Sequence, residues 1–223
     1  MGEGEKSMTS QRAVAGIDIG GEAKGNHLVI MCGTRILWNN RIRETPEQMI
    51  EKCIEHEVAA VGIDAPSRWR MGEIGRHAES LLAKMRISCF ATPTRERAGE
   101  SRFYDWMFNG EHVYNTFVER FPLFKGETEI DGQVCFETFP HAITCALRGR
   151  EVTSAKQKNA QRREALEQLG VETTSLRTID EVDAALCAVT ASCLLEGRVN
   201  VYGDGIGGFI IVPAPIGENK LPC

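Results

Sequence analysis

The run AVAGIDI (residues 13–19) is apolar and suited to a β-strand, and it carries a single acid, Asp18, near its end. The glycine-rich segment GGEAKG (20–25) follows it and predicts a turn. Two further strands, HLVIMC (27–32) and RILWNN (35–40), are predicted on either side of a short turn. Three strands joined by turns this short form an antiparallel meander.

A helix and a fourth strand are predicted after the meander. Thr45, Pro46 and Gln48 form the pattern of an N-cap, a first-turn proline and a capping box, which predicts a helix start. VAAVGIDA (58–65) is a continuous apolar run of the kind found in buried parallel strands, and Asp64 lies at its end. The predicted element order is therefore β-β-β-α-β.

The rest of the chain predicts a helical insertion, two strands and several helices. The insertion covers about residues 73–124, with a helix at 73–86 and an aromatic-rich segment at 102–124. We interpret these aromatic side chains as core residues that cover the sheet, not as a base-stacking surface. The later elements are a strand at 133–139, helices at 140–149, 154–170 and 177–197, and a final edge strand at 207–215. The segment GDGIGG (203–208) is interpreted as a plain glycine turn.

The composition is that of a soluble globular protein. The 223 residues are 42% hydrophobic and 26% charged, with a formal net charge of −5. We expect a single domain over residues 13–213, between a disordered tail at 1–12 and a C-terminal tail at 214–223. No apolar run has the roughly 18 residues that a membrane span needs, and the first twelve residues lack the apolar segment of a secretory signal.

The eight cysteines have no recognisable spacing. No two of them have the CxxC spacing of a zinc ribbon or a thioredoxin-type site, and most lie in apolar stretches such as ISCFA around Cys89. Free buried cysteine behaves as a small apolar residue. This usage favours a reducing compartment, so the predicted location is the cytoplasm.

Positive charge is concentrated in two segments of an otherwise acidic chain. Residues 68–102 carry eight Lys and Arg against four Asp and Glu, and residues 148–163 carry six against one. Such segments indicate either a phosphate-rich partner or solvated helix faces. Charge alone favours the solvated faces.

Acidic side chains occur in apolar strands and in one apolar helix. Asp18 and Asp64 close two strands, Glu137 lies in another, and Asp180 and Asp183 share a face of the last helix. A charged side chain rarely enters an apolar strand unless it is paired or binds a ligand. Oxygen-only ligands suit Mg²⁺ or Mn²⁺, and two such ions can promote phosphodiester cleavage. For any one of these acids, a turn, a helix cap or a salt bridge explains its position equally well.

The element order and the acids together resemble the ribonuclease H-like superfamily, and more closely the predicted-nuclease family named domain of unknown function 429. The matching stretches are GIDIGG (16–21), VGIDAPSRW (61–69), FATPTRE (90–96), CFETFPHA (135–142), AKQKNAQRREAL (155–166), DEVDAALCAVTA (180–191) and GGFIIVP (207–213). The resemblance implies an α/β fold with a mixed five-stranded sheet, a β-β-β-α-β core and helices on both faces. The stretch GGEAKGN departs from the tryptophan-containing GGW-type stretch usual in the family, which leaves substrate contact near this turn open.

The resemblance also implies roles for individual residues. The implied catalytic residues are Asp18, Asp64, Glu137 and Asp183. The implied ligands of Mg²⁺ or Mn²⁺ are these four and Asp180. The implied contacts to substrate phosphate are Arg95, Lys156 and Arg163. His141, at a predicted helix start, is a further candidate for a phosphate contact or general base, although a histidine satisfied near the helix cap is favoured.

The sequence leaves three functions to compare. We favour a metal-dependent nuclease that acts on nucleic acid. A nucleotide-binding phosphotransferase of the sugar kinase, Hsp70 and actin group is the second, because the run from Asp18 to Gly21 resembles the first phosphate loop of that group. Those enzymes usually duplicate their core, whereas this chain has room for one copy. The third is a catalytically inactive binding protein of the same fold, which the overall acidity favours. No GxxxxGK[ST] motif occurs, which excludes a P-loop NTPase.

Overall fold

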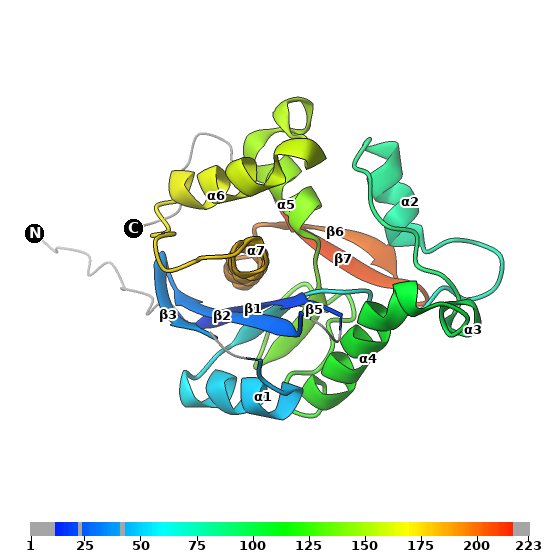
Figure 1. The fold of residues 1–223 in the computed structure, drawn as a ribbon, viewed down its shortest axis with the longest axis horizontal. Coiled ribbons are helices and arrows are strands. Elements are labelled where there is room, and N and C mark those ends of the chain that lie inside the picture. The colour runs from blue at the N-terminus through cyan, green and yellow to red at the C-terminus, as the bar shows by residue number, and fades with distance from the viewer. Residues whose placement is uncertain (1–11, 22–23, 41–42, 216–223) are drawn as a thin grey trace, which may run out of the picture.

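The computed structural model describes residues 12–21, 24–40 and 43–215. Seven strands form one mixed sheet in the order β3-β2-β1-β4-β5-β7-β6 (Figure 1). The strands are β1 Val14–Ile19, β2 Asn26–Cys32, β3 Arg35–Asn39, β4 Ala60–Asp64, β5 Val134–Glu137, β6 Val199–Asp204 and β7 Gly208–Pro213. Residues 1–11 of the predicted N-terminal tail and residues 216–223 of the predicted C-terminal tail lie outside the described residues.

Helices cover both faces of the sheet, as predicted. The helices are α1 Pro46–Glu55, α2 His77–Lys84, α3 Arg95–Ala98, α4 Asp105–Phe117, α5 Pro140–Arg148, α6 Lys158–Gln168 and α7 Ile179–Leu195, with short 3-10 helices at Arg102–Tyr104, Arg150–Val152 and Ala155–Gln157. α1 and α4 lie on one face, and α5, α6 and α7 lie on the other (Figure 1). Within the described ranges, no helix has the length and apolar character needed to cross a bilayer.

The predicted β-β-β-α-β core is confirmed. β1, β2 and β3 form the antiparallel meander, and β4, reached through α1, pairs with β1 in parallel. β5 and then β7 continue the parallel part of the sheet. The first four residues of β4 are buried, which is what a continuous apolar run in a parallel strand predicts.

The predicted five-stranded sheet is wrong, because two more strands join it. β7 was predicted as an edge strand, but it lies between β5 and β6. β6 forms the edge and pairs with β7 as an antiparallel hairpin. Its sequence VNVYGD is polar at alternate positions and exposed or half-buried throughout, so it lacks the apolar run that marks the inner strands. The hairpin turn lies in GDGIGG, where Asp204 Oδ1 accepts hydrogen bonds from the amides of Ile206 and Gly207.

Two glycines allow α7 to lie directly against β1 and β4. A Cβ on Gly16 would lie 1.9 Å from the carbonyl oxygen of Ala184, and a Cβ on Gly62 would lie 2.6 Å from that of Cys187. Neither distance leaves room for a side chain, so only glycine fits here. This close approach determines how near the side chains of α7 come to those of the two strands.

The capping signals of α1 are confirmed. The Thr45 hydroxyl accepts a hydrogen bond from the Gln48 amide at 3.4 Å, and Gln48 Oε1 accepts one from the Thr45 amide at 2.9 Å. Pro46 occupies the first turn. These contacts satisfy amide groups that a helix start would otherwise leave unpaired.

The helical insertion differs from its prediction in two respects. α2 begins at His77 and not at residue 73, and Arg76 before it takes part in a buried network described below. Phe117 and Phe121 are fully buried, as predicted for the aromatic-rich segment. Phe103 is 64% exposed, so the prediction that the aromatic side chains of this segment belong to the core is wrong for it.

The described cysteines are free thiols. Cys53, Cys135, Cys145, Cys187 and Cys193 are buried, and Cys32 and Cys89 are half-buried. Burial raises the pKa of the Cys135 thiol to about 12, so this group stays protonated and apolar. Cys223 lies outside the described residues. The cytoplasmic location stays a prediction.

Candidate functional site

Two aspartates lie side by side where β1 and β4 end. Asp18 and Asp64 are register partners in this parallel pair, so their side chains leave the sheet on the same face. The two carboxyl groups line the same pocket, and the charge of Asp64 raises the pKa of Asp18. Gly16 and Gly62 contact α7, and each lies two residues before one of the aspartates. Residues two apart in a strand lie on the same face, so Asp18 and Asp64 lie on the face that α7 covers.

The start of α7 brings two more aspartates to this place. A capping box fixes the N-terminus of the helix. Asp180 and Asp183 then line one pocket of about 690 Å³ together with Asp18 and Asp64. We call this pocket, defined by the four aspartates, the acidic pocket. Its acids come from opposite ends of the sequence, as predicted.

Burial and mutual repulsion raise the pKa values of three of these aspartates. Burial is the largest cause for Asp18, followed by the charges of Asp64, Asp183 and Asp180, and together they raise its pKa well above the usual value. Burial and then Asp183 raise the pKa of Asp64 to about 7. Burial raises the pKa of Asp183 to about 6, although the guanidinium of Arg162 opposes the rise. If all four aspartates are ionised, cations are needed nearby to neutralise their charges.

Four cationic side chains line the acidic pocket beside the acids, those of Lys24, Arg102, Lys158 and Arg162. Arg162 Nη1 donates a hydrogen bond to Asp183 Oδ2, and both side chains are buried. Lys24 Nζ lies 3.4 Å from Asp180 Oδ1, and Lys158 lines the pocket as well. Lys158 and Arg162 are four residues apart in α6, so they share one face of this helix. The pocket is therefore rich in both signs of charge.

The donor chemistry of the acidic pocket fits a hard divalent cation. As the side chains stand, no group of three or more His, Cys, Asp or Glu residues in the described part of the chain is arranged as a metal site. Arg162 forms an ion pair with Asp183, and Asp18 lies beside Asp64 in the strand register. However, Asp183 Oδ1 is buried without a hydrogen-bond partner, which is costly unless a ligand satisfies it. Carboxylate oxygens in such a position are the ligands that Mg²⁺ and Mn²⁺ prefer.

Glu137, which was also predicted as a ligand, does not reach the acidic pocket. It is the register partner of Ile63, one residue before Asp64, so its side chain leaves the opposite face of the sheet. Arg76 Nη1 and Nη2 donate to its two oxygens at 2.8 and 2.5 Å. Ser67 donates to Oε2 from its amide and hydroxyl at 2.8 and 2.9 Å. The predicted convergence is corrected to the four aspartates.

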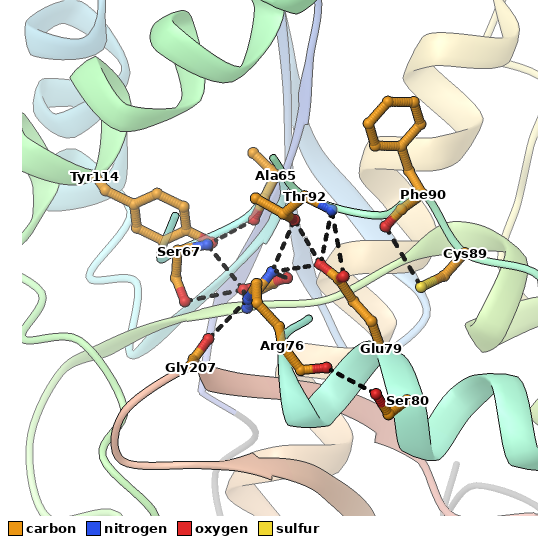
Figure 2. Close-up of polar contacts among 11 residues, drawn as sticks. Ala65, Ser67, Arg76, Glu79, Ser80, Cys89, Phe90, Thr92, Tyr114 and Gly207 are labelled. Atoms are coloured by element: carbon orange, nitrogen blue, oxygen red, sulfur yellow. Dashed lines mark hydrogen bonds and ion pairs between the residues drawn. The ribbon is translucent and has the colours of Figure 1, made fainter. Parts of the chain in front are cut away.

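Arg76 is the centre of a buried polar network, which Figure 2 shows. Its Nη1 lies 3.4 Å from Glu79 Oε1 and 3.3 Å from Thr92 Oγ1, and its Nε donates to the Gly207 carbonyl oxygen at 2.7 Å. Burial opposes its charge, but Glu137 and then Glu79 raise its pKa, so the guanidinium stays ionised. The network ties the segment after Asp64 to α2, to the segment around Thr92 and to the β6–β7 turn.

Two of the predicted phosphate contacts have partners within the protein. Arg95 Nε lies 3.1 Å from Glu111 Oε1. Arg163 donates to the carbonyl oxygens of Thr173 and Leu176 at 2.8 and 2.7 Å, which joins α6 to the segment before α7. Neither residue lines the acidic pocket.

The other two predicted phosphate contacts lie near α6 but outside the acidic pocket. Lys156 is exposed and lines a neighbouring groove, of which Lys158 is also part. His141 lies half-buried in α5, with its Nε2 3.9 Å from Cys145 Sγ. Burial lowers the pKa of His141, and the charge of Arg162 lowers it further, which favours the neutral ring.

Comparison with known families identifies the chain. A family model described as "Protein of unknown function (DUF429)" matches residues 16–205. The chain belongs to this family. A solved structure described as "Thermus thermophilus RuvC structure" is similar at 16% sequence identity and a TM-score of 0.42, over 83% of this chain and 95% of that chain. No residue role is transferred at this level of similarity. Among curated proteins, no match was found.

Sequence reasoning missed the cations that this DUF429 chain places beside its acids. It selected Lys156 and Arg163, whereas Lys158 and Arg162 line the pocket. Helical spacing does not choose between these two pairs, because residues four apart and residues seven apart both share a face of a helix. Lys24 was overlooked although it lies in the turn directly after β1.

Proposed function

We propose that this DUF429 protein is a metal-dependent nuclease that hydrolyses phosphodiester bonds in nucleic acid. The observation that carries the proposal is the convergence of Asp18, Asp64, Asp180 and Asp183 on one pocket. Four acids gathered at a half-buried place destabilise a protein unless cations neutralise them. Because the cluster does not stabilise the fold, it indicates a site that binds a metal ion.

Asp18, Asp64 and Asp183 would hold the cation, with Asp180 as a further ligand. The unpartnered Oδ1 of Asp183 and the raised pKa values of Asp18 and Asp64 support this assignment. Held by these residues, Mg²⁺ or Mn²⁺ would supply a Lewis acid suited to water activation and to stabilisation of the leaving oxygen of a phosphodiester. The capping box of α7 and the contact of Gly16 with α7 hold the ligands in place.

Lys24, Lys158 and Arg162 would bind the substrate phosphates. They line the same pocket as the acids, and each supplies donors that match phosphate oxygens. The chain has a formal net charge of −5, so a polyanion is attracted only where such cations gather. We therefore propose nucleic acid as the partner and the acidic pocket as the place where the backbone is held.

The test combines metal binding and cleavage. Labelled single- and double-stranded DNA and RNA are incubated with the wild type and Mg²⁺ or Mn²⁺, and thermal unfolding is measured with and without each metal. We expect metal-dependent cleavage and a metal-dependent rise in the unfolding temperature. The variant with Asp18→Asn and Asp64→Asn should lose both. Asp131→Asn, which changes an exposed acid outside the pocket, is the matched control and should lose neither.

One observation favours a second function, a binding protein of the same fold that lacks catalysis. The Arg162–Asp183 ion pair already neutralises one of the four acids without any metal. Under this alternative, metal would not raise the unfolding temperature, and the double Asn variant would bind nucleic acid as well as the wild type. Cleavage that persists in the double variant at the wild-type rate would contradict the nuclease proposal.

A further inference from the structure

Four aromatic side chains gather at the edge of the acidic pocket. We call Phe90, Phe103, Tyr104 and Trp106 the aromatic rim. The Phe90 ring lies 5.8 Å from that of Phe103, 6.1 Å from that of Tyr104 and 5.9 Å from that of Trp106, measured between centroids. Phe103 and Tyr104 are 5.1 Å apart. These are ordinary distances for aromatic rings in contact, so the rim is a packed group and not four isolated rings.

Two members of the aromatic rim present large apolar surfaces to solvent. Phe103 is 64% exposed and Phe90 is 41% exposed. Tyr114, Phe117 and Phe121 in the neighbouring helical segment are buried in the core. Clustered exposed aromatic rings are unfavourable in water and mark a place where a ligand binds.

Two members of the aromatic rim line the acidic pocket, and Phe90 lines an adjoining pocket together with Asp64 and Trp106. Phe103 and Trp106 line the acidic pocket together with Asp18 and Asp64. Lys158 lines it from the side of α6. A ligand that occupies this place meets carboxylates suited to a metal, cations suited to phosphate, and flat apolar rings. A nucleotide unit of a polynucleotide offers a counterpart to all three, because it joins a base with an exposed π face to a charged phosphodiester.

The protein interior holds the aromatic rim in place. The segment that carries Phe90 is anchored two residues later, where Thr92 donates from its amide and its hydroxyl to Glu79 Oε1 at 3.1 and 2.5 Å. Arg76 bonds to both of these residues. Figure 2 shows the Phe90 ring pointing away from this network. The ring is therefore fixed from behind while part of its surface stays exposed, which reduces the entropy lost when a ligand binds.

We propose that the aromatic rim, through Phe103 and Phe90, stacks against an unpaired nucleobase next to the phosphodiester held in the acidic pocket. The substrate class is then single-stranded nucleic acid, because in a duplex each base is already stacked between its neighbours. This inference rests on the proposed function for the position of the phosphodiester. The stacking itself requires only that the chain binds a strand.

The test measures binding without cleavage. Phosphorothioate oligonucleotides, which resist hydrolysis, are titrated as single strands and as matched duplexes, and fluorescence anisotropy gives Kd. We expect the wild type to prefer the single strand. Phe103→Ala should weaken single-strand binding by roughly 10-fold while leaving duplex binding unchanged. Phe103→Trp should restore the affinity because it keeps a flat ring.

A matched control separates stacking from loss of exposed apolar surface. Ile206→Ala removes a side chain that is 72% exposed and lies outside the acidic pocket, and it should leave both affinities unchanged. A wild type that prefers duplex, or a Phe103→Ala variant with unchanged single-strand affinity, overturns the inference. It is also overturned if sedimentation shows that Phe103→Ala dissolves a dimer, because the rim would then bind a second copy of this chain.

The outcomes distinguish this inference from the proposed function. Single-strand binding that depends on Phe103, without cleavage of an unmodified strand in Mg²⁺ or Mn²⁺, contradicts the nuclease but supports the stacking site. Metal-dependent cleavage whose rate is unchanged by Phe103→Ala supports the nuclease but contradicts the stacking site.

Discussion

Asp18 and Asp64 are register partners in adjacent parallel strands, and their carboxyl groups line the same pocket. Side chains of register partners lie on one face of the sheet, so the strand pairing keeps the two carboxyl groups near each other. The repulsion between them is therefore part of the fold, and it sets how the protein responds to metal, to pH and to substitution.

Substitution of Asp64 should stabilise the metal-free protein. Asp64→Asn removes a charge that burial and Asp183 disfavour, and the amide can still bond to Asp18. We expect the free energy of unfolding at neutral pH to rise by about 1–3 kcal/mol in urea denaturation with EDTA present. The same variant should lose the stabilisation by Mg²⁺ that we expect for the wild type. A variant that is less stable than the wild type without metal would contradict the account of the pocket.

The stability of the metal-free protein should fall as pH rises toward neutrality. Burial raises the pKa of Asp64 to about 7 and that of Asp183 to about 6, from an ordinary value of 3.8. Because the folded state binds these protons more tightly than the unfolded state, their contribution is fully present below about pH 4 and is lost as pH rises through about 7. Urea denaturation at a series of pH values measures this loss. The double variant with Asp18→Asn and Asp64→Asn should show a flatter profile, and identical profiles would contradict the prediction.

Gly16→Ala should be strongly destabilising. The added Cβ would lie 1.9 Å from a backbone oxygen of α7, which cannot move without displacing the whole helix. We expect a loss of about 3 kcal/mol or more, or failure to fold. Gly75→Ala is the matched control, because a Cβ there has nothing within 4 Å, and it should change the stability by less than about 0.5 kcal/mol. Thermal or urea unfolding of the two variants provides the comparison.

Removal of Arg76 should leave two buried carboxylates without compensation. Glu137 would lose its bidentate partner, and Glu79 would lose the nearby positive charge. We expect Arg76→Met to reduce the free energy of unfolding by about 3–5 kcal/mol. Addition of Glu137→Gln to this variant should recover part of the loss, since it removes one uncompensated charge. The double variant could instead lose as much free energy of unfolding as the two single variants together. The ion pair between Arg76 and Glu137 would then not have the role described here.

Lys158 and Arg95 should differ in their effect on nucleic-acid binding. Lys158 lines the acidic pocket, whereas Arg95 is paired with Glu111 away from it. Lys158→Gln should weaken binding of a single strand and reduce the slope of log K against log salt by about 1. Arg95→Gln should change neither quantity. Equal effects of the two substitutions would indicate diffuse charge attraction and not a defined phosphate contact.

Much of the fold could be predicted from apolar runs and turns. The meander, α1 with its capping box, and β4 have strong local signals, because their apolar patterns and caps occur together. β6 could not be found in this way. Its residues alternate between polar and apolar at the sheet edge, and only pairing with β7 stabilises it as a strand.

The site was less accessible to sequence reasoning, for two physical reasons. The face on which Glu137 emerges depends on the register between β4 and β5, and a shift of one residue moves a side chain to the other face. The rotation of α6 decides whether Arg162 or Arg163 meets the acids, and this rotation depends on packing against α7. Phe103 was assigned to the core by its residue type, since composition does not distinguish a covered ring from an exposed one.

The contact between Gly16 and Ala184 determines when the acidic pocket forms during translation. Translation delivers Asp18 and Asp64 long before Asp183, yet the acids can meet only after α7 has docked on the two strands. A growing polypeptide on the ribosome therefore holds only half of the acidic group. Any activity that depends on the complete group is withheld until α7 has been synthesised and has docked on the two strands.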